Sequence, residues 1–163
     1  MNLVEMFASK KEFDKVVAER VAKKGYIVDS YYGLDHLVFG FHCELMEFAN
    51  EIGFFKFWKM NHVQDDERIL DEGVDCLHVL MSIGNMKNYK VKEIEPFALW
   101  EDYSIEDMFT LLRQNSLETV SHWTRAFELV LGILVNLGYS ERAIMEQYEA
   151  KNNVNLKRQD TDY

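Results

Sequence analysis

The stretch from Asp66 to Met86, which reads DERILDEGVDCLHVLMSIGNM, decides the fold of this chain. Its apolar residues recur at helical spacing, and from Val74 to Ile83 they occupy almost every side of the predicted helix. A helix that is apolar nearly all round has to be surrounded by other elements. The sequence therefore predicts that residues 66–86 form the central, most buried helix.

Helical patterns continue on both sides of this stretch. Ser104-Ile-Glu-Asp107 has the form of a capping box, in which a serine and an acid cap the start of a helix. No segment alternates with period two for long enough to predict a strand, and residues 88–103 read as irregular. The predicted fold class is all-α, a bundle of about five to six helices. These cover 3–24, 34–52, 66–86, a segment that follows Ser104, 117–137, and 140 to about 151.

Length and charge limit the function. The 163 residues fit one domain, 1–163, with a real core. A net charge of -10 argues against nucleic-acid binding, which relies on Lys and Arg to neutralise phosphates. No apolar run approaches the roughly 20 residues of a membrane-spanning helix. We expect a soluble, cytoplasmic protein with neither a membrane nor a nucleic acid as partner.

Two predicted helices each carry a pair of acids three residues apart, Glu44-x-x-Glu47 and Glu72-x-x-Asp75. This spacing places both carboxylates of a pair on one helix face. If the two helices pack antiparallel, four carboxylates meet, and their mutual repulsion is tolerable only with cations among them. Hard oxygen ligands favour Mg²⁺, Mn²⁺ or Ca²⁺, and among these Mg²⁺ suits phosphate chemistry, with Mn²⁺ a possible substitute.

A plainer interpretation of these two acid pairs is that each lies on a solvated helix face, as we expect for Glu146-x-x-Glu149. Against it, Glu44 lies in line with the apolar residues Phe41 and Phe48, where an acid needs a partner. A salt-bridge interpretation needs nearby cations, yet residues 34–52 contain no Lys or Arg. These positions favour a metal site.

Three longer strings carry a family resemblance. They are CELMEFANEIGFFKFWK (43–59), DERILDEGVDCLHVLMSIGN (66–85) and YEAKNNVNLKRQDTDY (148–163). In this order they resemble the dimeric, all-α dUTPases, which are related to the MazG-type nucleotide pyrophosphatases. The resemblance implies a MazG-like helical homodimer that cleaves dUTP, or a related nucleotide, to the monophosphate and pyrophosphate with Mg²⁺.

The resemblance also implies roles for the acids. Glu44, Glu47, Glu72 and Asp75 match the metal ligands of the family. Two or three Mg²⁺ ions per site are expected, with a metal-activated water that attacks the α-phosphate. Glu47 is our choice for the catalytic residue that orients or deprotonates this water. His78, on the buried helix, is expected to be a core residue.

Substrate-binding residues are implied in two further segments. In Phe55 to Lys59, Trp58 is expected to pack on the nucleoside and Lys56 or Lys59 to pair with phosphate. The alternative, favoured for Phe55 and Phe57, is that aromatic residues plug the bundle end. Residues 151–163 are expected to form a polar arm over the phosphates. Its matching residues are Lys151, Asn152, Asn155, Arg158, Gln159 and Tyr163, of which Lys151, Asn155, Arg158 and Tyr163 are expected to bind the substrate.

The chain departs from the family pattern in two places. Some members carry glutamine and asparagine on the first helix to read uracil, whereas here the stretch is KKEFD (10–14), with Asp14 at the asparagine position. Asp162 stands where a glycine usually precedes the final tyrosine. Two alternatives therefore stay open. One is a house-cleaning pyrophosphatase for dCTP or modified nucleotides, and the other is a non-catalytic helical dimer in protein–protein regulation.

Overall fold

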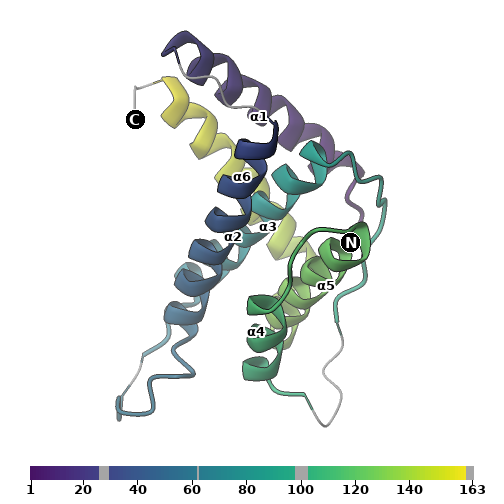
Figure 1. Cartoon of the computed structure of the whole chain (residues 1–163). Coiled ribbons are helices and arrows are strands. Elements are labelled where there is room, and N and C mark those ends of the chain that lie inside the picture. The colour runs from purple at the N-terminus through teal and green to yellow at the C-terminus, as the bar shows by residue number, and fades with distance from the viewer. Residues whose placement is uncertain (26–29, 62, 98–102, 161–163) are drawn as a thin grey trace.

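The computed structural model of the chain describes residues 1–25, 30–61, 63–97 and 103–160. Over these residues it contains six α-helices and one isolated β-bridge, which confirms the predicted all-α bundle (Figure 1). None of the described helices is long and apolar enough to cross a membrane. The helices are α1 (Val4–Lys23), α2 (Ser30–Ile52), α3 (Asp66–Met86), α4 (Ile105–Arg113), α5 (Val120–Asn136) and α6 (Glu141–Asp160).

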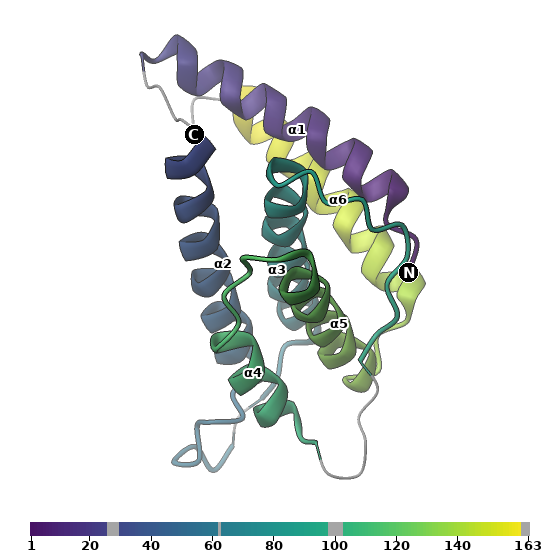
Figure 2. The ribbon, with the colours of Figure 1, turned by 45° about the vertical axis from the view of Figure 1, so that its right-hand side comes forward.

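Helix α3 is the centre of the bundle, as its sequence predicts. It packs against α1, α2, α5 and α6, so neighbours cover it on several sides (Figures 1 and 2). From Val74 to Ile83 most of its side chains are buried, and Leu77, Leu80 and Met81 have no exposed surface. Its start is fixed by Asp65, whose side chain accepts hydrogen bonds from the amides of Glu67 and Arg68.

Helices α2 and α3 run antiparallel and form the most extensive helix pair in the bundle (Figure 2). Gly53, with a φ of 72°, ends α2, since few other residues adopt this left-handed conformation. The link that follows, described over residues 53–61 and 63–65, projects from the end of the molecule opposite the C-terminal end of α6 (Figure 2). The predicted reversal between the two acid-bearing helices is therefore confirmed.

The capping box of α4 is also confirmed. The Ser104 side chain accepts from the amide of Asp107, and the Asp107 carboxylate accepts from the Ser104 amide at 2.9 Å. Helices α4 and α5 pack together, and α4 also contacts α2. The ring of Phe109 on α4 packs against that of Phe48 on α2, with centroids 5.4 Å apart.

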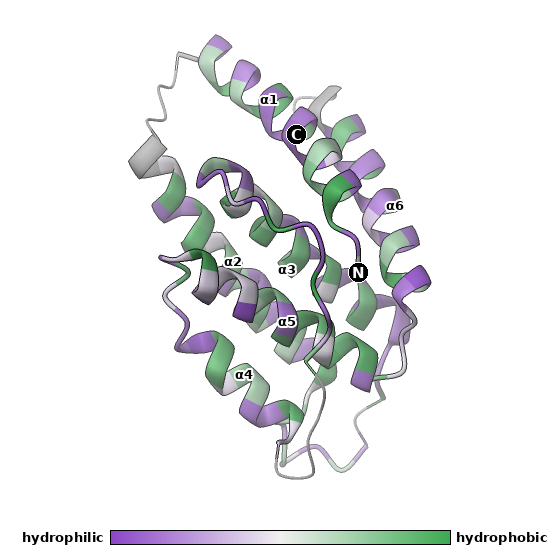
Figure 3. Ribbon diagram, turned by 90° about the vertical axis from the view of Figure 1, so that its right-hand side faces the viewer, coloured by the Kyte–Doolittle hydropathy of each residue, from purple (hydrophilic) through white to green (hydrophobic). Residues whose placement is uncertain are grey.

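Three helix boundaries differ from those predicted by more than one residue. Helix α5 begins at Val120 rather than at Leu117, whose φ of 56° is not helical. Helix α2 begins at Ser30 rather than near Leu34. Helix α6 does not end near Lys151 but continues to Asp160. Its second half has no apolar stripe, so the sequence pattern did not predict it as a helix. Figure 3 shows hydrophilic residues recurring along α6, which lies beside α1. Periodicity of apolar residues, the signal used to find the helices, is weak over this half.

Candidate metal centre

Three of the four predicted metal ligands come together between α2 and α3. One carboxylate oxygen each from Glu44, Glu72 and Asp75 lies within 4.8 Å of the other two. All three side chains are half-buried. The convergence follows from the sequence spacing, since Glu72 and Asp75 lie one turn apart on α3 and Glu44 faces them from the antiparallel α2.

Burial, together with the charges of neighbouring acids, raises the pKa of all three carboxyl groups. Burial and the charges of Asp75, Glu47 and Glu72 raise the pKa of Glu44 to about 7. Burial and the Asp75 and Glu47 carboxylates also raise the pKa of Glu72. Burial likewise raises the pKa of Asp75, although Lys151 opposes the shift. A divalent cation would remove this repulsion, so the donor set fits a metal of the Mg²⁺ type.

Glu47, the fourth predicted ligand, occupies a different position. It is exposed and does not belong to the group of three close oxygens. Its charge nevertheless contributes to the raised pKa of both Glu44 and Glu72, so it lies at the edge of the same cluster. This leaves its carboxylate accessible to a molecule that approaches from solvent.

A cation of α6, the predicted substrate-binding residue Lys151, also reaches this cluster. Lys151 Nζ of α6 lies 2.7 Å from Asp75 Oδ2 and 2.5 Å from Asp71 Oδ2. Gln147 Nε2 donates to the other Asp71 oxygen at 2.8 Å. Asp71 was not predicted as a site residue, although its position four residues before Asp75 places both on one face of α3.

The polar face of α6 runs on from Lys151. Asn155 and Arg158 follow at helical spacing, and Arg158 Nη1 lies 3.5 Å from Asn155 Oδ1. The pKa of Asp75 is raised by burial, and the charge of Arg158 opposes this rise. These side chains are held on a regular helix, because α6 continues to Asp160, and not on a separate arm. Tyr163, the last predicted residue of this segment, lies outside the described residues.

Asp14 belongs to a network on the same face of α3, further from the acids. Its Oδ1 accepts from Lys10 Nζ and from Ser82 Oγ, both at 2.9 Å. Lys10 is only 6% exposed, and this burial lowers its pKa. Asp75 and Ser82 are seven residues apart, two helical turns along α3. Ser82 was missed, because nothing in a single serine indicates which helix will pack against it.

Between these two groups lies His78, which is a core residue as predicted. Its ring stacks on that of Tyr148 of α6, with centroids 4.0 Å apart and planes 10° from parallel. Its Nε2 lies 3.2 Å from the Tyr148 carbonyl oxygen. Burial, first of all, and the charge of Lys10 lower the pKa of His78 to about 3, so the ring is neutral.

The aromatic and lysine segment is not part of this cluster within one chain. Trp58 is 60% exposed on the link between α2 and α3, and Lys59 is exposed beside it. Lys56 Nζ donates to the carbonyl oxygen of Asn50, at 2.6 Å. The link lies at the opposite end of the molecule from the C-terminus of α6 (Figure 2). One chain therefore does not bring the two predicted substrate-binding segments together.

Comparison with known proteins bears on the identity of the chain as a whole. A comparison with individually curated proteins gives no match. A family model described as dUTPase, that of the all-α dUTPases, matches residues 2–163, which is essentially the entire sequence. This match includes both acid pairs and the polar face of α6. The chain therefore belongs to the all-α dUTPase family and is a dUTP diphosphatase, a nucleoside triphosphate pyrophosphatase.

Proposed function

We propose that the chain hydrolyses dUTP to dUMP and pyrophosphate in a Mg²⁺-dependent reaction, with Glu44, Glu47, Glu72 and Asp75 as the metal site. The observation that carries the proposal is the close approach of three half-buried carboxylates, within 4.8 Å, from two antiparallel helices. Their raised pKa values support it, because such crowding is relieved by a divalent cation. Two or three ions per site, replaceable by Mn²⁺, agree with this number of oxygens.

When bound, Mg²⁺ supplies charge neutralisation for the triphosphate oxygens and activates water for attack on the α-phosphorus. The chain's own contribution begins with Glu47. Because this carboxylate is exposed and stands outside the group of three, it is free to accept a hydrogen bond from the attacking water and to take its proton. Glu44, Glu72 and Asp75 would have a separate role as ligands of the cation.

The phosphates would be held by the polar face of α6. Lys151, Asn155 and Arg158 provide two cations and an amide on one side of a rigid helix that already contacts the acid cluster through Lys151. Arg and Lys suit phosphate because they donate charge-assisted hydrogen bonds. Lys151 would exchange its Asp75 contact for a phosphate oxygen. Tyr163 remains a substrate-binding prediction from the family resemblance.

The base would lie toward Asp14, which we propose as a substrate-binding residue. Asp14 and Lys10 place an acceptor and a donor side by side. The edge of uracil offers the complement, an N–H flanked by two carbonyl oxygens. A buried polar pair of this kind disfavours a base that leaves one member unpaired.

We further propose that residues 1–163 act as a single domain and as a homodimer. Phe39 and Met46, seven residues apart on α2, are 72% and 45% exposed, and Cys43 between them is exposed as well. An apolar stripe of this kind marks an interface. Trp58, Lys56 and Lys59 lie on the link between α2 and α3, outside the acid cluster of their own chain. In a homodimer they would instead contact the nucleotide bound by the partner subunit. We expect dimers in sedimentation and monomers for Phe39→Glu, whereas a monomeric wild type contradicts the proposal.

The test of the function is pyrophosphate release from dUTP, dCTP, dTTP and UTP with Mg²⁺, with EDTA as the control. We expect metal-dependent turnover of dUTP in preference to the others, lost in Glu72→Gln and kept in Glu146→Gln, which changes an exposed acid of α6. If another nucleotide is preferred, specificity for dUTP is wrong and the chain is a house-cleaning pyrophosphatase. Turnover of dUTP that survives EDTA would refute the metal site.

A further inference from the structure

Asp71 lies beside the acid cluster but does not belong to it. It comes from α3, directly before Glu72, and its side chain is 35% exposed. In the described part of the chain the group of close carboxylate oxygens consists of Glu44, Glu72 and Asp75 and leaves Asp71 out. The proposed metal site therefore gives this carboxylate no role.

Both oxygens of Asp71 are held by α6. Lys151 Nζ contacts Oδ2 at 2.5 Å, and Gln147 Nε2 donates to Oδ1 at 2.8 Å. Gln147 and Lys151 lie four residues apart, so two successive turns of α6 hold one carboxylate of α3. A carboxylate whose two oxygens already accept from protein donors is poorly placed to be a metal ligand. What this arrangement fixes instead is the position of the Lys151 ammonium group.

Lys151 has a second partner, which differs from Asp71 in what else it binds. Nζ lies 2.7 Å from Asp75 Oδ2, and Asp75 is one of the three close acids. When Asp75 binds the proposed cation, like charges repel and the ammonium group has to leave this carboxylate. Asp71 lies outside the group of three and keeps its oxygen for the lysine. Of the two partners, Asp71 is thus the one that remains once the metal site is filled.

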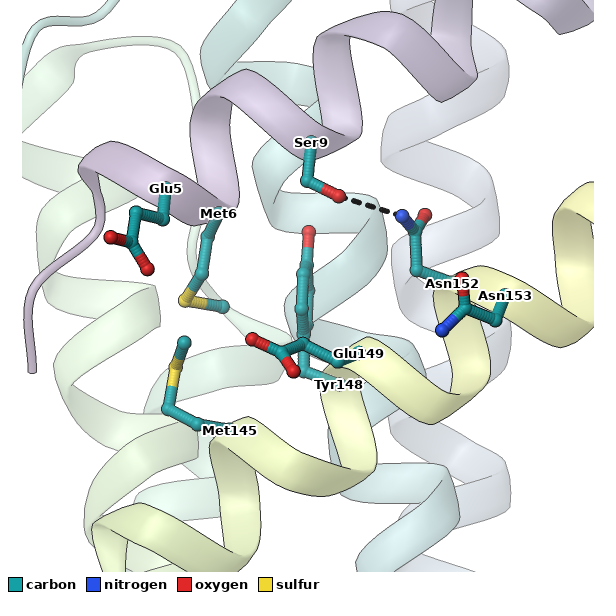
Figure 4. Close-up of a pocket in the computed structure, with 8 residues that line it drawn as sticks. All are labelled: Glu5, Met6, Ser9, Met145, Tyr148, Glu149, Asn152 and Asn153. Carbon is teal, nitrogen blue, oxygen red and sulfur yellow. Dashed lines mark hydrogen bonds between the residues drawn. The ribbon is translucent and has the colours of Figure 1, made fainter.

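The backbone that carries Lys151 is held by other contacts. Asn152, the next residue, donates from Nδ2 to Ser9 Oγ of α1 at 2.7 Å (Figure 4). The ring of Tyr148, almost one turn before Lys151, stacks on that of His78 of α3, with centroids 4.0 Å apart. Helix α6 is therefore fixed between α1 and α3 at this point, and what remains to be ordered is the side chain of the lysine itself.

We propose that Asp71 is a positioning residue for substrate binding, which holds the Lys151 ammonium group where it meets the phosphates of the nucleotide. The inference rests on the proposed function, in which Lys151 binds phosphate. An ammonium group has three N–H donors, so Nζ can keep one bond to Asp71 and direct the others to phosphate oxygens. Without Asp71 the nucleotide itself would have to order this long, flexible side chain, which lowers the affinity.

The test is a double-mutant cycle of Asp71→Asn and Lys151→Met. Asparagine keeps an oxygen for Gln147 but removes the charge that faces the lysine. Calorimetry with Mg²⁺ measures the affinity for α,β-imido-dUTP, and steady-state kinetics give KM and kcat for dUTP. We expect Asp71→Asn to weaken binding and raise KM about tenfold, with a much smaller change in kcat. In the Lys151→Met background the same substitution should have no further effect, because no ammonium group is left to position.

Two control variants separate this role from loss of charge or of fold. Glu67→Gln removes one negative charge from an exposed position of α3 and should leave the affinity unchanged. Gln147→Leu keeps both charges but removes the donor to Asp71. It should cause a smaller loss of affinity than Asp71→Asn, and this loss should also vanish in the Lys151→Met background. Thermal unfolding in EDTA checks that each variant is folded.

The cycle distinguishes failure of this inference from failure of the proposed function. If the loss in Asp71→Asn persists undiminished in the Lys151→Met background, the inference is overturned, because a metal ligand or a purely structural residue acts without the lysine. Wild-type affinity in Asp71→Asn, together with weak binding in Lys151→Met, would overturn it as well. In both cases the phosphate role of Lys151 stands. Wild-type affinity in Lys151→Met would instead refute that phosphate role, and the role of Asp71 with it.

Discussion

Lys151 Nζ lies 2.7 Å from Asp75 Oδ2, and through this contact α6 places a positive charge inside the acid cluster of α2 and α3. The same nitrogen contacts Asp71 Oδ2 at 2.5 Å, so the lysine bridges two acids one turn apart. The Lys151 side chain is 14% exposed, and the contact is therefore little weakened by solvent. Asp75 thus has two competing partners, a lysine of α6 and the proposed metal.

Removal of this lysine should weaken substrate binding more than it changes the fold. We expect Lys151→Met to raise KM for dUTP about 10- to 100-fold, which corresponds to one charge-assisted hydrogen bond to phosphate. The measurement is steady-state kinetics, with circular dichroism as a check of the fold. Lys157→Met, at an exposed position of the same helix, is the control. Equal effects of both substitutions would assign the change to net charge.

The stability of the metal-free chain should fall as the pH rises. The pKa of Glu44 is raised from 4.5 to about 7 in the folded state, chiefly by burial, so folding favours the protonated carboxyl. The stabilisation that this proton provides is complete below about pH 4.5 and is lost as the pH rises through 7. Urea unfolding in EDTA at pH 5 and at pH 7.5 measures the difference.

Two comparisons test whether the acid cluster causes this fall of stability with pH. Glu44→Gln, which is neutral at every pH, should flatten the pH dependence of the free energy of unfolding. Mg²⁺ at pH 7.5 should restore stability to the wild type, because a bound ion stabilises the folded state by mass action. A slope that is the same in wild type and Glu44→Gln would show that other groups produce it.

Variants of the buried pair Lys10 and Asp14 should distinguish its effect on stability from its effect on base specificity. Asp14→Asn leaves the lysine, 6% exposed, without its charged partner, and we expect a loss of about 1–3 kcal/mol in the free energy of unfolding. A Lys10→Met/Asp14→Leu double variant should recover most of that stability but not the preference for dUTP over dCTP. Thermal unfolding and competition assays measure the two effects. Unchanged preference in the double variant would place base recognition elsewhere.

Gly73, between the two acids of α3, should tolerate no side chain. A Cβ there would lie 2.7 Å from Leu134 Cδ2 and 3.1 Å from Phe48 Cζ. We expect Gly73→Ala to destabilise the chain by about 1–3 kcal/mol, since overpacking outweighs the better helix propensity of alanine. Gly40→Ala on α2, where the Cβ meets nothing within 4 Å, should instead stabilise by up to about 1 kcal/mol. Urea unfolding of both variants checks the contrast.

Several features of the site were predictable because their causes are local. The bounds of α3, the capping box at Ser104 and the convergence of Glu44, Glu72 and Asp75 follow from periodicity, caps and i, i+3 spacing. The partners of Lys151 and Ser82 were not predictable, because they depend on which helix packs beside α3. The helix end at Asp160 was missed because a polar helix lacks the apolar stripe that reveals it.

The most direct test of the central claim, that these acids bind the metal, is Mn²⁺ binding followed by electron paramagnetic resonance. With α,β-imido-dUTP present, we predict two or three bound ions per chain that Mg²⁺ displaces. Glu72→Gln should weaken their binding at least about tenfold, and Glu146→Gln should match the wild type. Equal Mn²⁺ binding by the wild type and Glu72→Gln would contradict the assignment of the acid cluster as the metal site.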